Sequence, residues 1–262
     1  MIKKIALALT GLIFIILSGL FLRKKLELSN QQTINPAKTH TKLIVGTSAD
    51  FPPFSFRDRT DDIVGFDIDI IKEIGKRLSL KIELIDRPFS LLIPQIQIGQ
   101  VDVIAAGMTP TPEREKNLRF TKIYLSDNPL VIVTPKNKAS NIKNIDDLKG
   151  KSVIVNTGYV SDTYVSKFPE IQITRLPKVS DAMIALEHNK ADAFVTASLT
   201  LEPYSSQLSK FNVIPIEGTS ETSALGVSKK IPDELFEKIQ KALDDMEKDG
   251  TLKSIKLKWK FE

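Results

Sequence analysis

The sequence of 262 residues contains no cysteine and only two histidines, His40 and His188. The absence of cysteine excludes disulfides, thiolate catalysis, cysteine-ligated metals and lipid attachment at a cysteine. No G-x-S-x-G, H-E-x-x-H or phosphate-binding glycine loop is present either. The motifs of common hydrolases, metallopeptidases and nucleotide-binding enzymes are therefore missing. We expect a protein that is not an enzyme and that has no cofactor and no metal.

The chain after residue 25 also lacks a net charge. The whole sequence has 37 Lys and Arg residues against 32 Asp and Glu residues. Residues 1–25 contain five of the basic residues and no acidic one, which leaves 32 of each sign in the remainder. Nucleic-acid binding requires a basic patch on the folded part of a protein. The charge balance therefore predicts no nucleic-acid partner.

The beginning of the chain indicates export. Residues 5–22 form an uncharged apolar run between two short basic segments, which is typical of an export signal. The run is longer than most signal cores and close to the length that spans a bilayer. We interpret residues 1–25 as a signal peptide or a membrane anchor and the polar residues 26–41 as a linker. The folded part is then expected in the periplasm, with residues 5–22 either clipped or kept as a tether.

Apolar patterns of strands and helices alternate from residue 42 onward. The first series predicts strands at 43–46, 81–85 and 101–106 and helices at 65–78 and 90–99. The second series predicts strands at 130–134, 152–155, 171–173 and 193–196, with helices after Ser161, at 180–188 and at 233–259, the last of these broken at Gly250. Alternation of this kind indicates mostly parallel sheets flanked by helices. Two such series predict an α/β fold with two lobes.

Arg114 ends the most informative turn of the chain. The strand at 101–106 opens into a turn of Gly, Thr and Pro that leads to this arginine. Small residues leave backbone N–H groups accessible, and the guanidinium offers a planar fork of donors that fits a carboxylate. A surface loop with a solvated arginine is the alternative. Because ligands gather at the carboxyl ends of parallel strands, the loops at 47–54 and 106–114 are both expected to face one cleft.

Some polar residues have simpler interpretations. Asp67 and Asp69 could suggest a metal pair, but the pattern favours Asp67 as the cap of the helix that begins there. Ser161 or Asp162 is likewise expected to cap the helix that follows it.

Eight segments, taken in order, resemble one known family. They lie at 45–47, 51–54, 64–69, 89–94, 101–114, 148–151, 191–193 and 249–251. Together they resemble the polar-amino-acid solute-binding proteins of ABC importers, which are the bacterial extracellular solute-binding proteins of family 3. The segment around 107–115 is most similar to the arginine-binding members. The resemblance covers residues 42–262.

This resemblance implies a hinged, two-lobed periplasmic-binding-protein fold. Lobe 1 would comprise residues 42–129 plus 224–262, and lobe 2 residues 130–223. A monomer would bind L-arginine, or another basic or polar amino acid, in the cleft between the lobes. It would deliver the amino acid to an inner-membrane ABC permease that is powered by a separate ATPase. Two alternatives share the fold: a cyclohexadienyl or arogenate dehydratase-like enzyme, with Asp50 as its carboxylate, and an amino-acid-sensing ectodomain.

The family pattern also implies how the ligand's α-carboxylate is held. Arg114 would clamp the carboxylate, with help from Thr109 and from backbone groups of Ala106 and Gly107. Thr157 would close on the same group from the second lobe, together with its neighbour Tyr159.

The ligand side chain would lie between two aromatic rings. Phe51 and Phe89 would sandwich it, and a cation over an aromatic face gains about 0.5–2 kcal/mol.

Two departures from the family pattern concern charge. Where members often carry an acid this chain has Ser48, and Asp50 is the nearest carboxylate. Where members usually carry an aspartate for the α-ammonium this chain has Ala197. The ammonium would then need another acceptor, such as Glu202 or a backbone carbonyl.

Overall fold

The computed structural model describes residues 40–137 and 141–261. The interpretation of residues 1–25 as a signal or anchor, and most of the linker, therefore lie outside the described residues. Within the described ranges, no helix has the length and apolar character needed to cross a bilayer. From Thr41 onward the chain forms one compact unit.

The first lobe is built on a five-stranded sheet with the order β5-β1-β6-β15-β7. The strands are β1 (Lys42–Thr47), β5 (Lys81–Asp86), β6 (Val103–Ile104), β7 (Leu118–Phe120) and β15 (Gly226–Ser228). Strand β1 is parallel to β5 and β6, whereas β15 is antiparallel to both β6 and β7. The helices of this lobe are α2 (Phe66–Leu78), α3 (Phe89–Ile98), α4 (Pro112–Glu115), α7 (Asp233–Lys248) and α8 (Thr251–Lys258).

The second lobe is built on a second five-stranded sheet with the order β11-β10-β12-β9-β13. Its strands are β9 (Leu130–Pro135), β10 (Ser152–Asn156), β11 (Gln172–Leu176), β12 (Ala193–Ala197) and β13 (Phe211–Pro215). Strand β10 is parallel to β11 and β12, and β9 is antiparallel to β12 and β13. The helices are α5 (Val160–Val165), α6 (Val179–Glu187) and the 3₁₀ segments η1 (Ile145–Leu148) and η2 (Ser198–Lys210).

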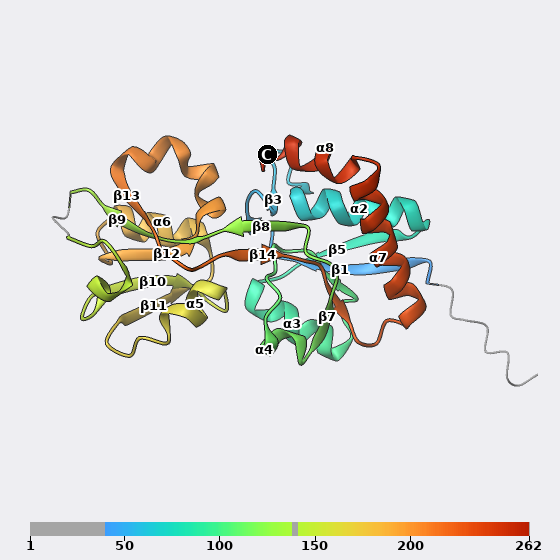
Figure 1. The fold of residues 1–262 in the computed structure, drawn as a ribbon, viewed down its shortest axis with the longest axis horizontal. Coiled ribbons are helices and arrows are strands. Elements are labelled where there is room, and N and C mark those ends of the chain that lie inside the picture. The colour runs from blue at the N-terminus through green and yellow to red at the C-terminus, as the bar shows by residue number, and fades with distance from the viewer. Residues whose placement is uncertain (1–39, 138–140, 262) are drawn as a thin grey trace, which may run out of the picture. The chain divides into compact units, whose positions relative to one another are not determined.

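Two antiparallel segments join the lobes. Strands β8 (Leu125–Asn128) and β14 (Glu221–Ser223) pair with each other and lie between the two sheets (Figure 1). Their pairing has an irregular register between Glu221 and Ser223. The chain therefore crosses from one lobe to the other twice, side by side.

A small sheet lies at the end of β1. It consists of β2 (Asp50–Phe51), β3 (Ser55–Arg57) and β4 (Ile63–Val64), paired antiparallel in sequence order. Since β1 and β6 are parallel, their carboxyl ends lie at the same edge of the first sheet. The small sheet and the turn after β6 both start from that edge, as the sequence predicted for the loops at 47–54 and 106–114.

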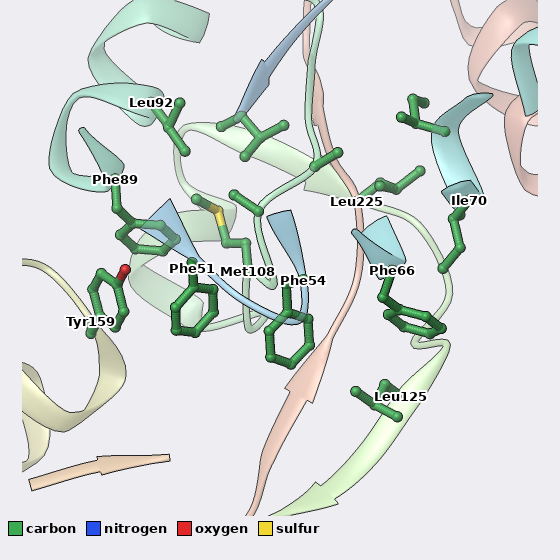
Figure 2. Packing of buried hydrophobic residues seen from close by; sticks show 14 of the residues in the cluster. Phe51, Phe54, Phe66, Ile70, Phe89, Leu92, Met108, Leu125, Tyr159 and Leu225 are labelled. Atoms are coloured by element: carbon green, nitrogen blue, oxygen red, sulfur yellow. The ribbon is translucent and has the colours of Figure 1, made fainter. Parts of the chain in front are cut away.

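The buried side chains explain the helices of the first lobe. In α2, Phe66, Ile70 and Ile74 recur at every fourth position and are fully buried. Apolar residues at this spacing form one stripe of a helix, so α2 packs that stripe into the core. Figure 2 shows Phe66 and Ile70 packed in the same cluster as Leu125 on β8 and Leu225, which follows β14.

The α/β alternation was predicted correctly, and the antiparallel strands were not. In each five-stranded sheet three neighbouring strands are parallel, β5-β1-β6 and β11-β10-β12, and the other pairs are antiparallel. The sequence pattern did not predict β7, β13 and β15 in these sheets, nor the separate pair β8 and β14. The strand predicted at 101–106 is confined to β6. The helical segment at 233–259 is broken at Gly250 as predicted, because Gly250 takes a left-handed conformation between α7 and α8.

Both predicted helix caps are wrong. Helix α2 has Gly65 at its N-cap, and Asp67 lies inside the first turn with no capping bond. Helix α5 has Tyr159 at its N-cap, so Ser161 and Asp162 also lie inside the helix. The Asp67 carboxylate accepts a hydrogen bond from the amide of Gly107, forty positions away, and the Asp162 carboxylate accepts one from the amide of Gly158, in the turn just before its own helix.

Candidate functional site

Arg114 lies buried where the two lobes meet. It belongs to the four-residue helix α4, which Thr111 caps by accepting a hydrogen bond from the Arg114 amide, 3.3 Å between Oγ1 and N. The side chain is 9% exposed. Its Nη1 donates to the carbonyl of Thr109 at 2.8 Å, and its Nη2 donates to the carbonyl of Gly158 at 3.0 Å. The guanidinium therefore bridges the first lobe and the second.

Burial affects this guanidinium without discharging it. Burial lowers the pKa of Arg114, and the nearby Glu221 and Tyr159 act in the opposite direction. Arginine stays protonated in proteins even so. Five N–H donors are available on the side chain, and two bonds go to carbonyls. A positive charge with spare donors at this position can bind an anion.

The turn that leads to Arg114 is fixed by the buried carboxylate of Asp67. The Asp67 Oδ2 atom accepts hydrogen bonds from the Gly107 amide at 2.6 Å and from the Tyr124 hydroxyl at 2.9 Å. Burial raises the pKa of the Asp67 carboxyl to about 7, although both hydrogen bonds act to lower it. Asp67 thus acts through Gly107 and positions the turn, and the Gly107 N–H group is already bonded.

Aromatic rings line the space beside Arg114. The Arg114 guanidinium lies 5.3 Å from the centre of the Phe89 ring. The Tyr159 ring packs against Phe89 at 4.6 Å and against Phe51 at 5.1 Å between centroids. Figure 2 shows Tyr159 beside Phe89 and Phe51, while Phe54 stacks on the far side of Phe51. Phe51 and Phe89 therefore have the ring of Tyr159 as their common neighbour.

We call the space enclosed by these groups the Arg114 pocket. Its lining residues come from both lobes: Phe51, Phe89, Gly107, Thr109, Arg114, Tyr159, Val160 and Glu221. Its cavity volume is about 10 Å³, roughly what one water molecule needs. The Tyr159 hydroxyl is buried and has no hydrogen-bond partner among residues 40–137 and 141–261. Burial raises its pKa well above the ordinary value, so it is a neutral, unused donor.

Two of the predicted site residues line a different cavity. Ser48 and Asp50 lie next to each other, with the Ser48 hydroxyl donating to Asp50 Oδ1 at 2.7 Å. They line a cavity of about 300 Å³ together with Asp86 and Lys178, which lie on opposite lobes. Burial raises the pKa of Asp50, while the bond from Ser48 and the charge of Lys178 act to lower it. We call this the Asp50 cavity.

The remaining two predicted residues line neither space. Ala106 is fully buried just before the turn. Thr157 is partly buried, and its amide donates to the Leu176 carbonyl at 3.0 Å. The structure thus gathers Phe51, Phe89, Gly107, Thr109, Arg114 and Tyr159 in one place, puts Ser48 and Asp50 in the neighbouring cavity, and leaves Ala106 and Thr157 outside both.

Sequence reasoning missed Glu221. It is the single carboxylate among the residues found to line the Arg114 pocket in the described part of the chain. Burial raises the pKa of its carboxyl to about 7, and the charge of Arg114 acts to lower it. One signal was available: Glu221 is an acid in one of the two crossings between the lobes, and such a crossing must pass the cleft.

Comparison with known protein sequences identifies the family to which this chain belongs. The sequence model of the family described as bacterial extracellular solute-binding proteins, family 3, matches residues 43–262. The arginine-binding extracellular protein ArtP of Bacillus subtilis is 34% identical over 224 residues, which cover 83% of this chain and 86% of the relative.

Solved structures of arginine-binding proteins are similar to this one over most of its length. A crystal structure of a mutant of ArgBP from T. maritima superimposes with a TM-score of 0.80 at 36% identity, covering 86% of this chain and 97% of that one. An ancestral arginine-binding protein bound to arginine has a TM-score of 0.78 at 38% identity, covering 84% and 98%. These similarities confirm the predicted fold of two α/β lobes.

Proposed function

Because this chain belongs to family 3 of the bacterial extracellular solute-binding proteins, we propose that it binds L-arginine, or another basic or polar amino acid, around Arg114. The family makes it a binding component of amino-acid import and not an enzyme. The observation that carries the ligand assignment is the buried guanidinium of Arg114 at the junction of the lobes. A carboxylate is the anion that every free amino acid brings.

The ligand α-carboxylate binds the N–H groups of Arg114 that do not donate to carbonyls. A guanidinium can hold both oxygens of a carboxylate in one plane, which fixes the direction of the ligand as well as its charge. The hydroxyl of Thr109 lies in the lining of the same pocket and can donate to the carboxylate. The Gly107 amide is already bonded to Asp67 and is therefore not available to the carboxylate.

The ligand side chain takes the place of the Tyr159 ring, which packs against both Phe51 and Phe89. A guanidinium or ammonium there gains from both ring faces, by about 0.5–2 kcal/mol. The neighbouring Asp50 cavity provides the carboxylate of Asp50, while that of Asp86 is already paired with Arg57 at 3.2 Å. A long cationic side chain that extends into this cavity gains Asp50 as a charged partner. Arginine fits this arrangement better than a neutral or acidic amino acid.

Binding requires the lobes to separate and close again. The Arg114 pocket has far too little volume for an amino acid while Tyr159 packs on Phe51 and Phe89. We assign residues 42–129 plus 224–262 to lobe 1 and residues 130–223 to lobe 2, with β8 and β14 as the hinge. A few residues that absorb backbone rotation are enough for such closure. Ligand then shifts the population to the closed form, because only that form offers both sets of contacts.

The cellular setting follows from the family and from the N-terminal sequence. The protein is exported and works as a monomer in the periplasm, free or tethered by residues 5–22. Its closed form docks on an ABC permease in the inner membrane, and a separate ATPase drives release of the amino acid.

Thermal unfolding in the presence of each of the twenty amino acids tests the proposal. A ligand that binds only the folded state adds RT ln(1 + [L]/Kd), about 2.7 kcal/mol at a hundredfold excess over Kd. Arginine is expected to raise the midpoint most. A larger shift with glutamine or an acidic amino acid would overturn arginine as the ligand, and no shift with any amino acid would overturn the function.

A further inference from the structure

The α-carbon of an amino acid carries a negative carboxylate and a positive ammonium group, and Arg114 can bind only the carboxylate. The following inference rests on the proposed function. A buried ammonium without an acceptor is strongly unfavourable, so the pocket must supply an oxygen for it, preferably a charged one. Because the ammonium and the carboxylate are attached to the same carbon atom of the ligand, the acceptor of the ammonium must lie in the same pocket as Arg114.

Neither the residue at the position of the family's aspartate nor the two acids named in the sequence analysis meets that requirement. Ala197 on β12 carries no polar group. Glu202 on η2 is exposed and does not line the Arg114 pocket. Asp50 accepts a hydrogen bond from Ser48 and lines the neighbouring cavity.

Glu221 does meet it. Its side chain lines the Arg114 pocket together with Arg114, Thr109 and Gly107. It is only partly exposed, yet its carboxylate has no hydrogen bond or ion pair to any residue in the described ranges 40–137 and 141–261. A half-buried acid is normally bonded. Its position beside Arg114 suits a group that brings a positive charge.

The other groups around Glu221 leave it that role. From α4 it faces the Arg114 guanidinium, and from the turn before α5 it faces the Tyr159 hydroxyl. Its strand partner β8 places Asn128 opposite it, next to the exposed Asp127. Arg114 is the one cation among these neighbours, and it donates to carbonyls of Thr109 and Gly158 instead of pairing with Glu221.

We propose that Glu221 accepts the α-ammonium of the bound amino acid while Arg114 holds its α-carboxylate. Glu221 is then a specificity-determining residue that selects α-amino acids over carboxylic acids that lack the amine. Since it lies on β14, one of the two segments that join the lobes, this contact also ties the ligand backbone to the hinge.

Proton release is a second consequence. Burial places the pKa of Glu221 near 7, so about half of the carboxyls are protonated at pH 7. An ammonium beside the carboxylate favours the charged form and lowers that pKa. Binding therefore releases up to about half a proton at pH 7, and affinity rises with pH through the range around 7 before it levels off.

The test is calorimetric titration of the full folded protein and two variants with arginine and with its des-amino analogue. Each titration is run at pH 7 in two buffers that differ in ionisation enthalpy, which gives the number of protons released. Glu221→Gln keeps the shape of the side chain and removes its charge. Glu217→Gln is the matched control, since Glu217 is exposed on the same segment and does not line the pocket.

We expect Glu221→Gln to weaken arginine binding by about 10- to 100-fold, the range for a lost charged hydrogen bond. It should leave binding of the des-amino analogue unchanged and abolish proton release. Glu217→Gln should behave as the unchanged protein does. A thermal melt of each variant without ligand shows that it is folded, and Glu221→Asp should recover part of the loss if the carboxylate itself is needed.

The outcomes separate the inference from the proposed function. If the unchanged protein binds arginine but Glu221→Gln binds it equally well, with the same proton release, the role of Glu221 is wrong and the function stands. Equal losses for arginine and for the des-amino analogue would also overturn it, because they would mean that Glu221 only shapes the pocket. If the unchanged protein binds no amino acid, both fail.

Discussion

The two sides of the Arg114 pocket are built differently. On the first lobe, the turn that carries Gly107 and Thr109 is fixed from behind by the fully buried Asp67, and Phe54 stacks on Phe51. On the second lobe, apart from Glu221 on β14, the pocket is lined by a single turn with Tyr159, whose hydroxyl has no partner in the described structure, next to the exposed Gly158. In the closure that we propose, the first side would be a preformed binding surface and the second side would move away from it when the lobes separate.

The largest expected effect comes from removing the charge of the first side. Arg114→Ala should weaken arginine binding by more than about 100-fold, because it leaves the ligand carboxylate buried without a partner. Calorimetry at one pH and salt concentration measures the loss. Arg114→Lys is the control that keeps the charge but not the planar fork. Its affinity for arginine should lie between that of Arg114→Ala and that of the unchanged protein. Tight binding by Arg114→Ala would remove the basis of the site.

Two glycines near Arg114, one on each side, give a matched comparison of stability. Both have positive φ, 60° at Gly107 and 78° at Gly158. A Cβ at Gly107 would lie 2.8 Å from Phe51 and 2.9 Å from Phe54, whereas a Cβ at Gly158 would meet Ser90 at an ordinary 3.6 Å. Gly158→Ala should cost about 1–2 kcal/mol of unfolding free energy, the strain of a left-handed residue.

Gly107→Ala should cost roughly 3 kcal/mol or more, since collision with the packed rings adds an overpacking cost of about 1–3 kcal/mol. Urea unfolding of both variants measures the difference. Equal losses would show that the first side is as adaptable as the second, contrary to the comparison.

Asp67 gives the first side a pH dependence of stability. Its pKa is raised to about 7 by burial, so the folded state holds a proton that the unfolded state has already lost. Stability from this group therefore falls as pH rises from about 4 to about 7. The variant Asp67→Asn lacks this titrating carboxyl. The unfolding free energy of the variant, relative to that of the unchanged protein, should increase by about 2–3 kcal/mol between pH 5 and pH 8.

The pKa of Glu221 is also raised to about 7 by burial, so Glu221→Gln should show a similar pH dependence, whereas replacement of the exposed Glu217 by Gln should show none. A pH-independent difference between Asp67→Asn and the unchanged protein would mean that Asp67 stays charged when buried.

The smallest expected effect is on the second side. Tyr159→Phe removes a buried hydroxyl that has no partner among the described residues and keeps the ring that packs on Phe51 and Phe89. An unsatisfied buried donor costs about 1–3 kcal/mol, so the variant should be more stable than the unchanged protein by about 1 kcal/mol. Differential scanning calorimetry would detect this as a midpoint higher by about 2–4 °C. A lower midpoint would indicate that the hydroxyl is bonded.

The periodicity of the sequence was sufficient for the parallel half of the fold. Strands such as β1 and β10 are continuous apolar runs, and α2 places an apolar residue at every turn. The antiparallel strands were not found because β14 and β15 are three residues long and pair with segments about a hundred positions away. Pairing over such distances leaves no local pattern.

Local patterns also explain which site residues could be predicted. Arg114 was found because the turn before it has a distinctive composition. Asp67 was taken for a cap because an acid at the start of a helix normally serves that role, and its bond to Gly107 joins residues forty positions apart. Glu221 has no local feature of its own, and only the return of the chain between the lobes brings it to Arg114.

A crystal structure of the protein grown with arginine is the most direct test of the central claim. The account predicts both oxygens of the α-carboxylate within about 3.2 Å of Arg114 nitrogen atoms, with the ligand side chain between Phe51 and Phe89 and the Tyr159 ring displaced from that place. An arginine whose carboxylate faces solvent or another group, with Arg114 still bonded only to the carbonyls of Thr109 and Gly158, would contradict it.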